Sequence, residues 1–168
     1  MRKILLISDT HGYLEPKLIK YIQEADEVWH AGDIGQTDLC ETIQKYCKLR
    51  AVHGNIDDQA TRQQFVEHLD FMCEDVKVYM THIGGYPGKY PKAVKEMLLK
   101  HQPQIFICGH SHILKVMYDK ELSLLHLNPG AAGVHGFHQT KTALRFQIEA
   151  KDIKNLEIIE MGPRHQLS

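Results

Sequence analysis

The chain has 168 residues, with 20 Lys and Arg against 21 Asp and Glu, which gives a formal net charge of −1. This length fits one domain with a buried core, which we expect over residues 1–168. The balanced charge argues against a binder of long nucleic acid but allows a small phosphorylated substrate. No stretch approaches the roughly 20 apolar residues of a membrane helix, and the apolar run at residues 4–7 is too short for a secretory signal. We therefore expect a cytoplasmic protein without membrane contact.

The first half of the chain alternates strand and helix patterns. Apolar runs predict strands at residues 3–8, 26–33 and 48–55, and apolar residues at helical spacing predict helices at 14–22 and 38–47. Pro16 fits the first turn of the first of these helices. A βαβαβ order of this kind predicts a parallel sheet with right-handed crossovers.

The second half is richer in strands. Residues 65–82 predict two short strands, the second at 76–81, and residues 92–102 predict an amphipathic helix. Further strands are predicted at residues 103–110, 114–120, 122–128, 142–150 and 155–161, with a hairpin turn at 118–121. We therefore expect an α/β fold in which two mixed β-sheets pack together and helices flank them.

Polar side chains follow the ends of five predicted strands. They are Asp9, His11, Asp33, Asn55, His82, His110 and His112. In open α/β sheets, ligands bind beyond the carboxyl ends of the strands, so we expect these seven side chains to converge on one edge.

The chemistry of this set points to metal ions. Carboxylates, an amide oxygen and imidazoles suit Mn, Fe, Ni, Zn or Mg. Seven ligands are too many for one ion with an open position, but they fit two ions bridged by one carboxylate. Paired ions about 3.5–4 Å apart are a common device for hydrolysing phosphate esters. Gly32, Gly54 and Gly109, which stand beside these ligands, allow sharp turns and close backbone approach.

Each motif also has an ordinary structural explanation. Asp9 could cap a helix, and Gly54 with Asn55 could form a simple turn. The repetition at five strand ends favours a single metal centre over five unrelated features. The four cysteines form no CxxC pair, so a zinc ribbon is not expected.

Taken in order, the motifs resemble the signature of the calcineurin-like metallophosphoesterases. The matching segments are DTH, AGD, GNID, TH and GHSH, and the resemblance covers the whole chain. It is most similar to the small bacterial and archaeal phosphodiesterase branch, whose members also carry an NPG segment, here residues 128–130.

The resemblance implies two divalent metal ions, with manganese favoured and Ni, Fe, Zn or Mg as alternatives. One ion would be held by Asp9, His11, Asp33 and His112, and the other by Asp33, Asn55, His82 and His110. Asp33 would bridge the ions, and Asp33, Asn55 and His82 would take part in catalysis. The implied reaction is hydrolysis of a small phosphodiester by metal-activated hydroxide, in a dimer or higher homo-oligomer.

One position departs from the family. Many members have a histidine directly after the asparagine, where this chain has Ile56, which cannot transfer protons. General acid catalysis contributes about 10²–10⁴-fold, so its loss argues against vigorous phosphomonoesterase activity. His135 or His138, in a glycine-rich segment, could replace this acid, or the segment could be an exposed polar loop. Asp57 could support a ligand by hydrogen bonding, or could simply stabilise a turn.

Three alternative functions stay open at this point. One is a phosphomonoesterase or nucleotide hydrolase on the same site. A second is a non-catalytic scaffold, as in a eukaryotic retromer subunit that resembles this fold but has degraded metal ligands. The third is a structural zinc protein with one ion, against which the lack of cysteines near the cluster counts.

Overall fold

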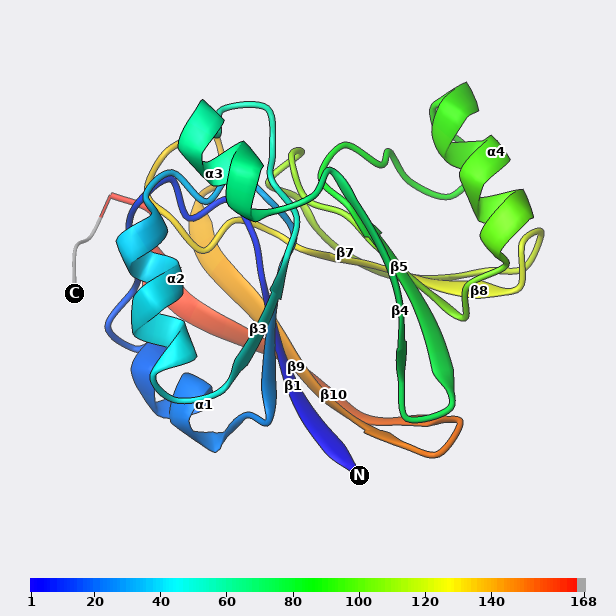
Figure 1. Cartoon of the computed structure of the whole chain (residues 1–168), viewed down its shortest axis with the longest axis horizontal. Helices are drawn as coiled ribbons and strands as arrows, with labels where there is room; N and C mark the ends of the chain where they lie inside the picture. The colour runs from blue at the N-terminus through cyan, green and yellow to red at the C-terminus, as the bar shows by residue number, and fades with distance from the viewer. Residues whose placement is uncertain (166–168) are drawn as a thin grey trace.

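The structure is a computed structural model that describes residues 1–165, and within them it has two five-stranded sheets and four α-helices (Figure 1). In spatial order, the first sheet consists of β10 (Asp152–Pro163), β9 (Thr140–Glu149), β1 (Arg2–Ile7), β2 (Glu27–His30) and β3 (Lys48–Ala51). The second consists of β4 (His68–Cys73), β5 (Val76–Thr81), β6 (Ile105–Ile107), β8 (Leu124–Pro129) and β7 (Leu114–Asp119). The helices are α1 (Leu18–Glu24), α2 (Thr37–Gln44), α3 (Gln59–Gln64) and α4 (Lys92–His101).

Both sheets are mixed, as the sequence predicts. In the first sheet β1, β2 and β3 are parallel, while β9 runs antiparallel to both β1 and β10. In the second sheet β5, β6 and β8 are parallel, and β4 and β7 pair antiparallel at its edges. The α/β sandwich of two mixed sheets flanked by helices is therefore confirmed.

The central strand β1 shows why its sequence is apolar without alternation. Ile4 and Leu6 face the core between the sheets, while Leu5 and Ile7 pack under the helices of the outer layer. Because both faces of β1 are covered, every residue from Ile4 to Ile7 is buried.

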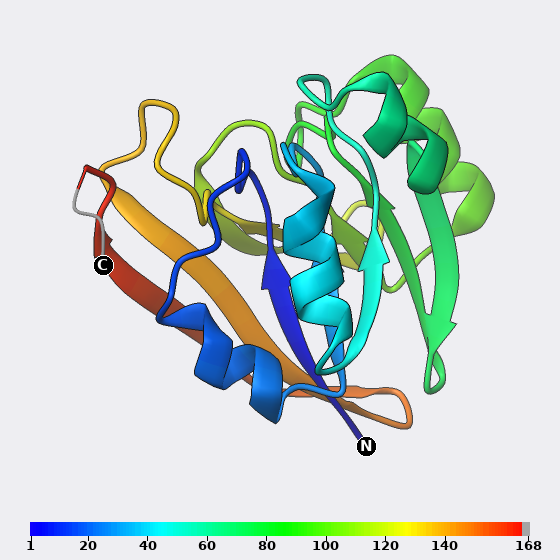
Figure 2. The ribbon, with the colours of Figure 1, turned by 60° about the vertical axis from the view of Figure 1, so that its left-hand side comes forward.

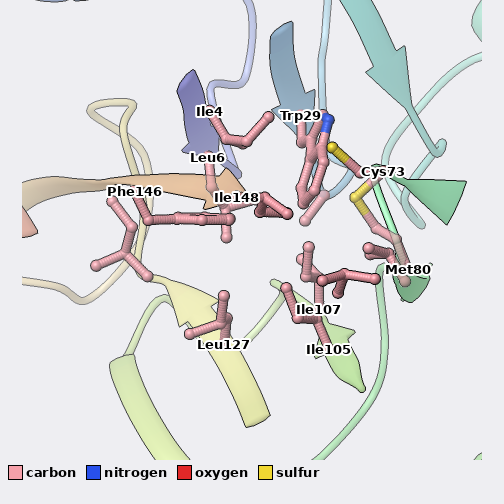
Figure 3. Close-up of a cluster of buried hydrophobic side chains, with 14 of the residues drawn as sticks. Ile4, Leu6, Trp29, Cys73, Met80, Ile105, Ile107, Leu127, Phe146 and Ile148 are labelled. Atoms are coloured by element: carbon pink, nitrogen blue, oxygen red, sulfur yellow. The ribbon is translucent and has the colours of Figure 1, made fainter. Parts of the chain in front are cut away.

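The two sheets meet through an apolar core (Figure 3). Trp29 and Phe146 from the first sheet lie opposite Met80 and Ile107 from the second, and all four are almost fully buried. This packing fixes the position of one sheet relative to the other.

Helices cover the outer faces of the sandwich. Leu18 of α1 and Ile43 of α2 bury their side chains on the first sheet, and Val94 and Leu98 of α4 pack on the second (Figures 1 and 2). None of these helices, within the described residues, is long and apolar enough to cross a membrane.

Two helices differ from the prediction. The helix predicted from residue 14 begins at Leu18, because Pro16 and Glu15 lie in a turn and the Glu15 carboxylate is buried in an ion pair with Lys141 of β9. Helix α3 was not predicted, since Thr61 is its only buried residue and it therefore has no apolar periodicity.

Candidate metal centre

Six of the seven predicted ligands form two adjacent groups. Asp9, His11 and His112 make one group and Asp33, His82 and His110 make the other, with the ligand atoms of each group within 4.8 Å of one another. These residues follow strands of both sheets, so the centre lies where the two sheets meet at one edge.

The two groups also touch each other. His82 Nε2 is 3.2 Å from Asp33 Oδ2 and 3.9 Å from Asp9 Oδ1. His11 Nε2 lies 3.8 Å from Asp33 Oδ2, so this oxygen faces an imidazole of each group. One carboxylate oxygen is thereby placed between two sets of ligands, as a bridging ligand would be.

Asn55, the seventh residue, lies in the loop after β3. The neighbouring Ile56 N–H donates to Asp33 Oδ1 at 3.1 Å, which places this loop against the Asp33 carboxylate. The Asn55 side chain is exposed, and its backbone carbonyl accepts a hydrogen bond from Arg62 Nη2 at 3.0 Å. Its role as a ligand stays a prediction.

One hydrogen bond of His82 fixes the way in which its ring faces the centre. Its Nδ1 lies 2.7 Å from the carbonyl oxygen of Ala31, which can only accept, so Nδ1 carries a proton. In the neutral ring, Nε2 then turns a lone pair towards Asp33 Oδ2. Two acceptors facing each other need a cation between them or a second proton on the ring. Burial lowers the pKa of His82, but the close Asp33 carboxylate and the charge of Asp9 outweigh burial and raise that pKa overall.

Each carboxylate has one oxygen tied to the protein and one turned to the imidazoles. Asp9 Oδ2 accepts from Ser8 Oγ at 2.6 Å and from the His110 N–H at 3.1 Å, whereas Asp33 Oδ1 accepts from the Ile56 N–H. Burial raises the pKa of Asp33, but the nearby His82 imidazole outweighs burial, so the pKa of Asp33 is lowered overall. Hydrogen bonds thus fix the orientation of both carboxylates, and the second oxygen of each one faces the imidazoles, where it can bind a cation.

Unpartnered buried atoms gather at this centre. Within residues 1–165, Asp9 Oδ1, His11 Nε2 and His82 Nε2 are buried and reach no hydrogen-bond partner. Buried polar atoms without partners are rare in folded proteins and call for an explanation, such as a bound ion. The donor set therefore fits divalent metal ions.

The backbone supports the same interpretation. Five of the candidate ligands adopt positive φ, namely Asp9 (53°), His11 (48°), Asp33 (54°), His110 (68°) and His112 (59°). Residues other than glycine adopt this region infrequently, and such conformations cluster at functional sites.

Glycines let the loops approach one another closely. A Cβ at Gly109 would overlap Ser8 Oγ and lie 2.8 Å from Asp9 Oδ2, and a Cβ at Gly54 would overlap Asp33 Oδ1. A buried strand ends in the sequence CGHSH because a side chain at Gly109 would displace the Asp9 carboxylate.

Asp57 joins two of the ligand-bearing loops. Its buried carboxylate accepts from the Gly54 N–H at 2.7 Å, the Gly35 N–H at 2.8 Å and the Ile34 N–H at 3.2 Å. Both interpretations of Asp57 therefore hold, because it stabilises its own turn and also fixes the backbone beside Asp33.

Sequence reasoning missed the hydroxyl groups that support the centre. Thr10 Oγ1 donates to the Ile34 carbonyl at 2.9 Å and lies 2.8 Å from Nε2 of the buried His30. His30 Nδ1 accepts from the Gly32 N–H at 3.2 Å, so His30 joins the loops after β1 and β2. The run SDTH contains Ser8 and Thr10 beside the ligands, but hydroxyl residues in loops are too common to single out.

The glycine-rich segment after β8, residues 130–139, borders the centre. His138 Nδ1 is 3.2 Å from His112 Nδ1, and the ring of His135 lies 5.7 Å from that of His11, measured between centroids. His135 is exposed and Phe137 is fully exposed, so the tip of the segment meets solvent while His138 faces inward.

A cavity on the first sheet lies away from these ligands. It has a volume of about 250 Å³ and is lined by residues that include Tyr21, Glu24, Arg145 and Glu157. The Arg145 guanidinium there already pairs with Glu157 at 2.6 Å, so this cavity offers no comparable set of unpartnered groups.

The chain is similar to known proteins in both sequence and fold. Residues 2–151 match the model of the calcineurin-like phosphoesterase superfamily domain, and no curated protein matches the chain. Among solved structures, a predicted phosphoesterase from Streptococcus pneumoniae has 21% identity and a TM-score of 0.71, covering 99% of this chain and 92% of that one. A novel archaeal phosphodiesterase has 21% identity and a TM-score of 0.71, covering 94% and 99%. Vps29 from Entamoeba histolytica in complex with Zn²⁺ has 15% identity and a TM-score of 0.72, covering 95% and 99%. The fold is thus shared with these structures, and the match over residues 2–151 shows that the chain belongs to the calcineurin-like phosphoesterase superfamily.

Proposed function

We propose that this chain is a phosphodiesterase that uses two divalent metal ions to hydrolyse a small phosphodiester. The observation that carries the proposal is the pair of adjacent ligand groups, with Asp33 Oδ2 facing both and three buried ligand atoms unpartnered within residues 1–165. The similarity to an archaeal phosphodiesterase supports the choice of diesters.

We assign the seven ligands to two ions that share Asp33, starting from the two groups of three. Asp9, His11, Asp33 and His112 would hold one ion, and Asp33, Asn55, His82 and His110 the other. Manganese is the favoured metal, although the Zn²⁺ bound by a structurally similar Vps29 makes zinc the first alternative to test. When bound, the ions generate a nucleophile from water at neutral pH and offset the negative charge of the phosphoryl group.

The protein's own residues hold these groups in place. The Ala31 carbonyl orients His82, the Ile56 N–H orients Asp33, and the His110 N–H with Ser8 orients Asp9. A site held in this way needs little reorganisation when charge develops on the substrate.

The side chain at position 56 bears on substrate choice. Ile56 is 47% exposed and cannot protonate a leaving group, which disfavours substrates with poor leaving groups. Of the two histidines that could replace the acid, His138 has both ring nitrogens engaged, with Nε2 lying 2.9 Å from the Gly133 carbonyl oxygen. We therefore assign proton donation to His135, whose exposed ring lies beside His11.

A binding role without catalysis is the second candidate. Apolar residues follow three of the ligands directly, and Ile56, Ile83 and Ile113 are 47%, 47% and 66% exposed. Such a rim could seat either an apolar leaving group or a protein partner.

The test is metal-dependent hydrolysis by metal-stripped protein. Mn, Ni, Mg and Zn are added back in turn, and rates are compared on bis-p-nitrophenyl phosphate and p-nitrophenyl phosphate. We expect turnover of the diester that disappears in Asp33→Asn and persists in Asp152→Asn, whose exposed carboxylate lies away from the centre. Faster hydrolysis of the monoester would replace the proposal with a phosphomonoesterase, and two bound ions without turnover of either would favour the binding role.

A further inference from the structure

We infer that His138 is a positioning residue that fixes the tautomer of His112, so that His112 Nε2 offers its lone pair to the metal centre. The inference rests on the proposed function in so far as that centre holds metal ions. His138 lies 26 residues from His112 in the chain and belongs to none of the motifs at the strand ends.

The segment that carries His138 is anchored at both ends. The Gly133 N–H donates to the Asp9 carbonyl at 3.1 Å, which joins the segment to the loop of the first ligand. Arg164 Nε donates to the His138 carbonyl at 3.0 Å, and Arg164 Nη1 donates to the Val134 carbonyl at 3.3 Å. The His138 ring is therefore held against the centre although the tip of the segment is exposed.

The proton positions follow from what each group can do. The Gly133 carbonyl only accepts, so His138 Nε2, 2.9 Å away, carries a proton. In the neutral ring, His138 Nδ1 is then an acceptor. It faces His112 Nδ1 at 3.2 Å, so His112 Nδ1 must donate.

This assignment decides what His112 offers to the centre. With its proton on Nδ1, His112 directs the lone pair of Nε2 towards Asp9 Oδ1, 3.1 Å away. Both atoms are then acceptors, and a cation between them satisfies both. Histidine ligands of metals usually donate their other ring N–H to a fixed acceptor, and His138 supplies that acceptor here.

Without His138, a competing arrangement becomes available. His112 could move its proton to Nε2 and donate to Asp9 Oδ1, which otherwise reaches no partner within residues 1–165. That hydrogen bond would occupy the lone pair of His112 and the free oxygen of Asp9 together. His138 therefore favours the tautomer that can bind metal over the one that cannot.

Gly136 makes the approach of the two rings feasible. Its φ is +120°, and a Cβ at this position would overlap His112 Nδ1 and Cε1 while lying 3.3 Å from His138 Nδ1. A glycine here leaves the space between the two imidazoles open.

The experiment compares three variants at position 138 in the full chain. Asn can place its amide oxygen where His138 Nδ1 lies, Phe keeps the ring shape without an acceptor, and Ala removes both. His101→Phe, at the C-terminal end of α4, is the control. ¹⁵N NMR of metal-free protein reports which nitrogen of His112 is protonated, and calorimetric titration with MnCl₂ reports the affinity of each site.

We expect His112 to be protonated at Nδ1 in the wild type and in His138→Asn, and at Nε2 in His138→Phe and His138→Ala. The latter two should bind one of two Mn²⁺ ions about 10–100-fold more weakly, and Asn should restore most of the affinity. An unchanged His112 tautomer in His138→Phe, or unchanged affinity for both ions, would overturn the inference. If the wild type binds fewer than two ions, the proposed function fails, and the tautomer measurement alone decides the role of His138.

Discussion

Asp57 offers a sharp test of how the centre is held. Its carboxylate accepts from three backbone N–H groups, with Oδ2 serving Gly54 and Ile34 and Oδ1 serving Gly35. In Asp57→Asn the amide oxygen can keep the pair at Oδ2, but the NH₂ group then faces the Gly35 N–H, donor against donor. A hydrogen bond to a charged group contributes about 1.5–3 kcal/mol, and a buried donor left unsatisfied costs about 1–3 kcal/mol. Because the loop can relax in part, we expect a net loss of about 2–4 kcal/mol in the free energy of unfolding.

Urea denaturation of metal-free protein measures this loss without involving the ions. Asp58→Asn is the matched control, because Asp58 accepts from the Thr61 N–H at 2.8 Å as the N-cap of α3, and Asn caps helices about as well as Asp. The control should leave the unfolding midpoint unchanged. A loss below about 1 kcal/mol in Asp57→Asn would refute the view that these three bonds hold the loops after β2 and β3 together.

Further predictions concern acid, metal and the missing proton donor. Burial lowers the pKa of His126 from 6.5 to about 4. Between these two pH values the unfolded chain binds a proton at His126 that the folded chain does not, so the free energy of unfolding should fall by about 2 kcal/mol at pH 5. The buried His126 ring reaches no hydrogen-bond partner within residues 1–165, so Phe can replace it without losing a hydrogen bond. In His126→Phe, the difference in unfolding free energy between pH 7.5 and pH 5, measured by urea denaturation, should therefore be smaller than in the wild type. An equal difference in the two proteins would contradict the prediction. Free Mn²⁺ at 100 times its Kd should stabilise the protein against thermal unfolding by about 2.7 kcal/mol per site. An unchanged unfolding temperature would speak against binding. Gly109→Ala should abolish this stabilisation by displacing Asp9, and an unchanged stabilisation would show that the added methyl group leaves Asp9 in place. Ile56→His should raise the rate on diphenyl phosphate by up to about 10²-fold while Ile83→His does not; equal rates would show that position 56 lies away from the leaving group.

The sequence predicted the parts of this structure that depend on short-range pattern. The strand expected at residues 76–81 is β5 (Val76–Thr81), and the helix expected at 92–102 is α4 (Lys92–His101). The convergence of Asp9 with Asp33, and of His82 with His110, followed from one rule, that parallel strands of a sheet end at a common edge. Both steps need only the residue types and their order along the chain.

What the sequence did not predict depends on contacts between distant residues. Glu15, just before α1, forms a buried ion pair with Lys141, which lies 126 residues away in the chain. The pairing of His112 with His138 joins two loops that no periodicity relates. Only the three-dimensional packing of the sandwich reveals such partners, because neither residue differs in type from many exposed ones.

The origin of the ligands in both sheets has a mechanical consequence. Asp9 and Asp33 belong to loops of the first sheet, whereas His82 and His110 belong to loops of the second. An ion bound by Asp33 and His82 would link the two sheets and resist both their sliding and their separation at that edge. Amide hydrogens of β2 and β5 beneath it would then exchange more slowly in the loaded protein, and the far edge of the sandwich would become the place where local opening begins.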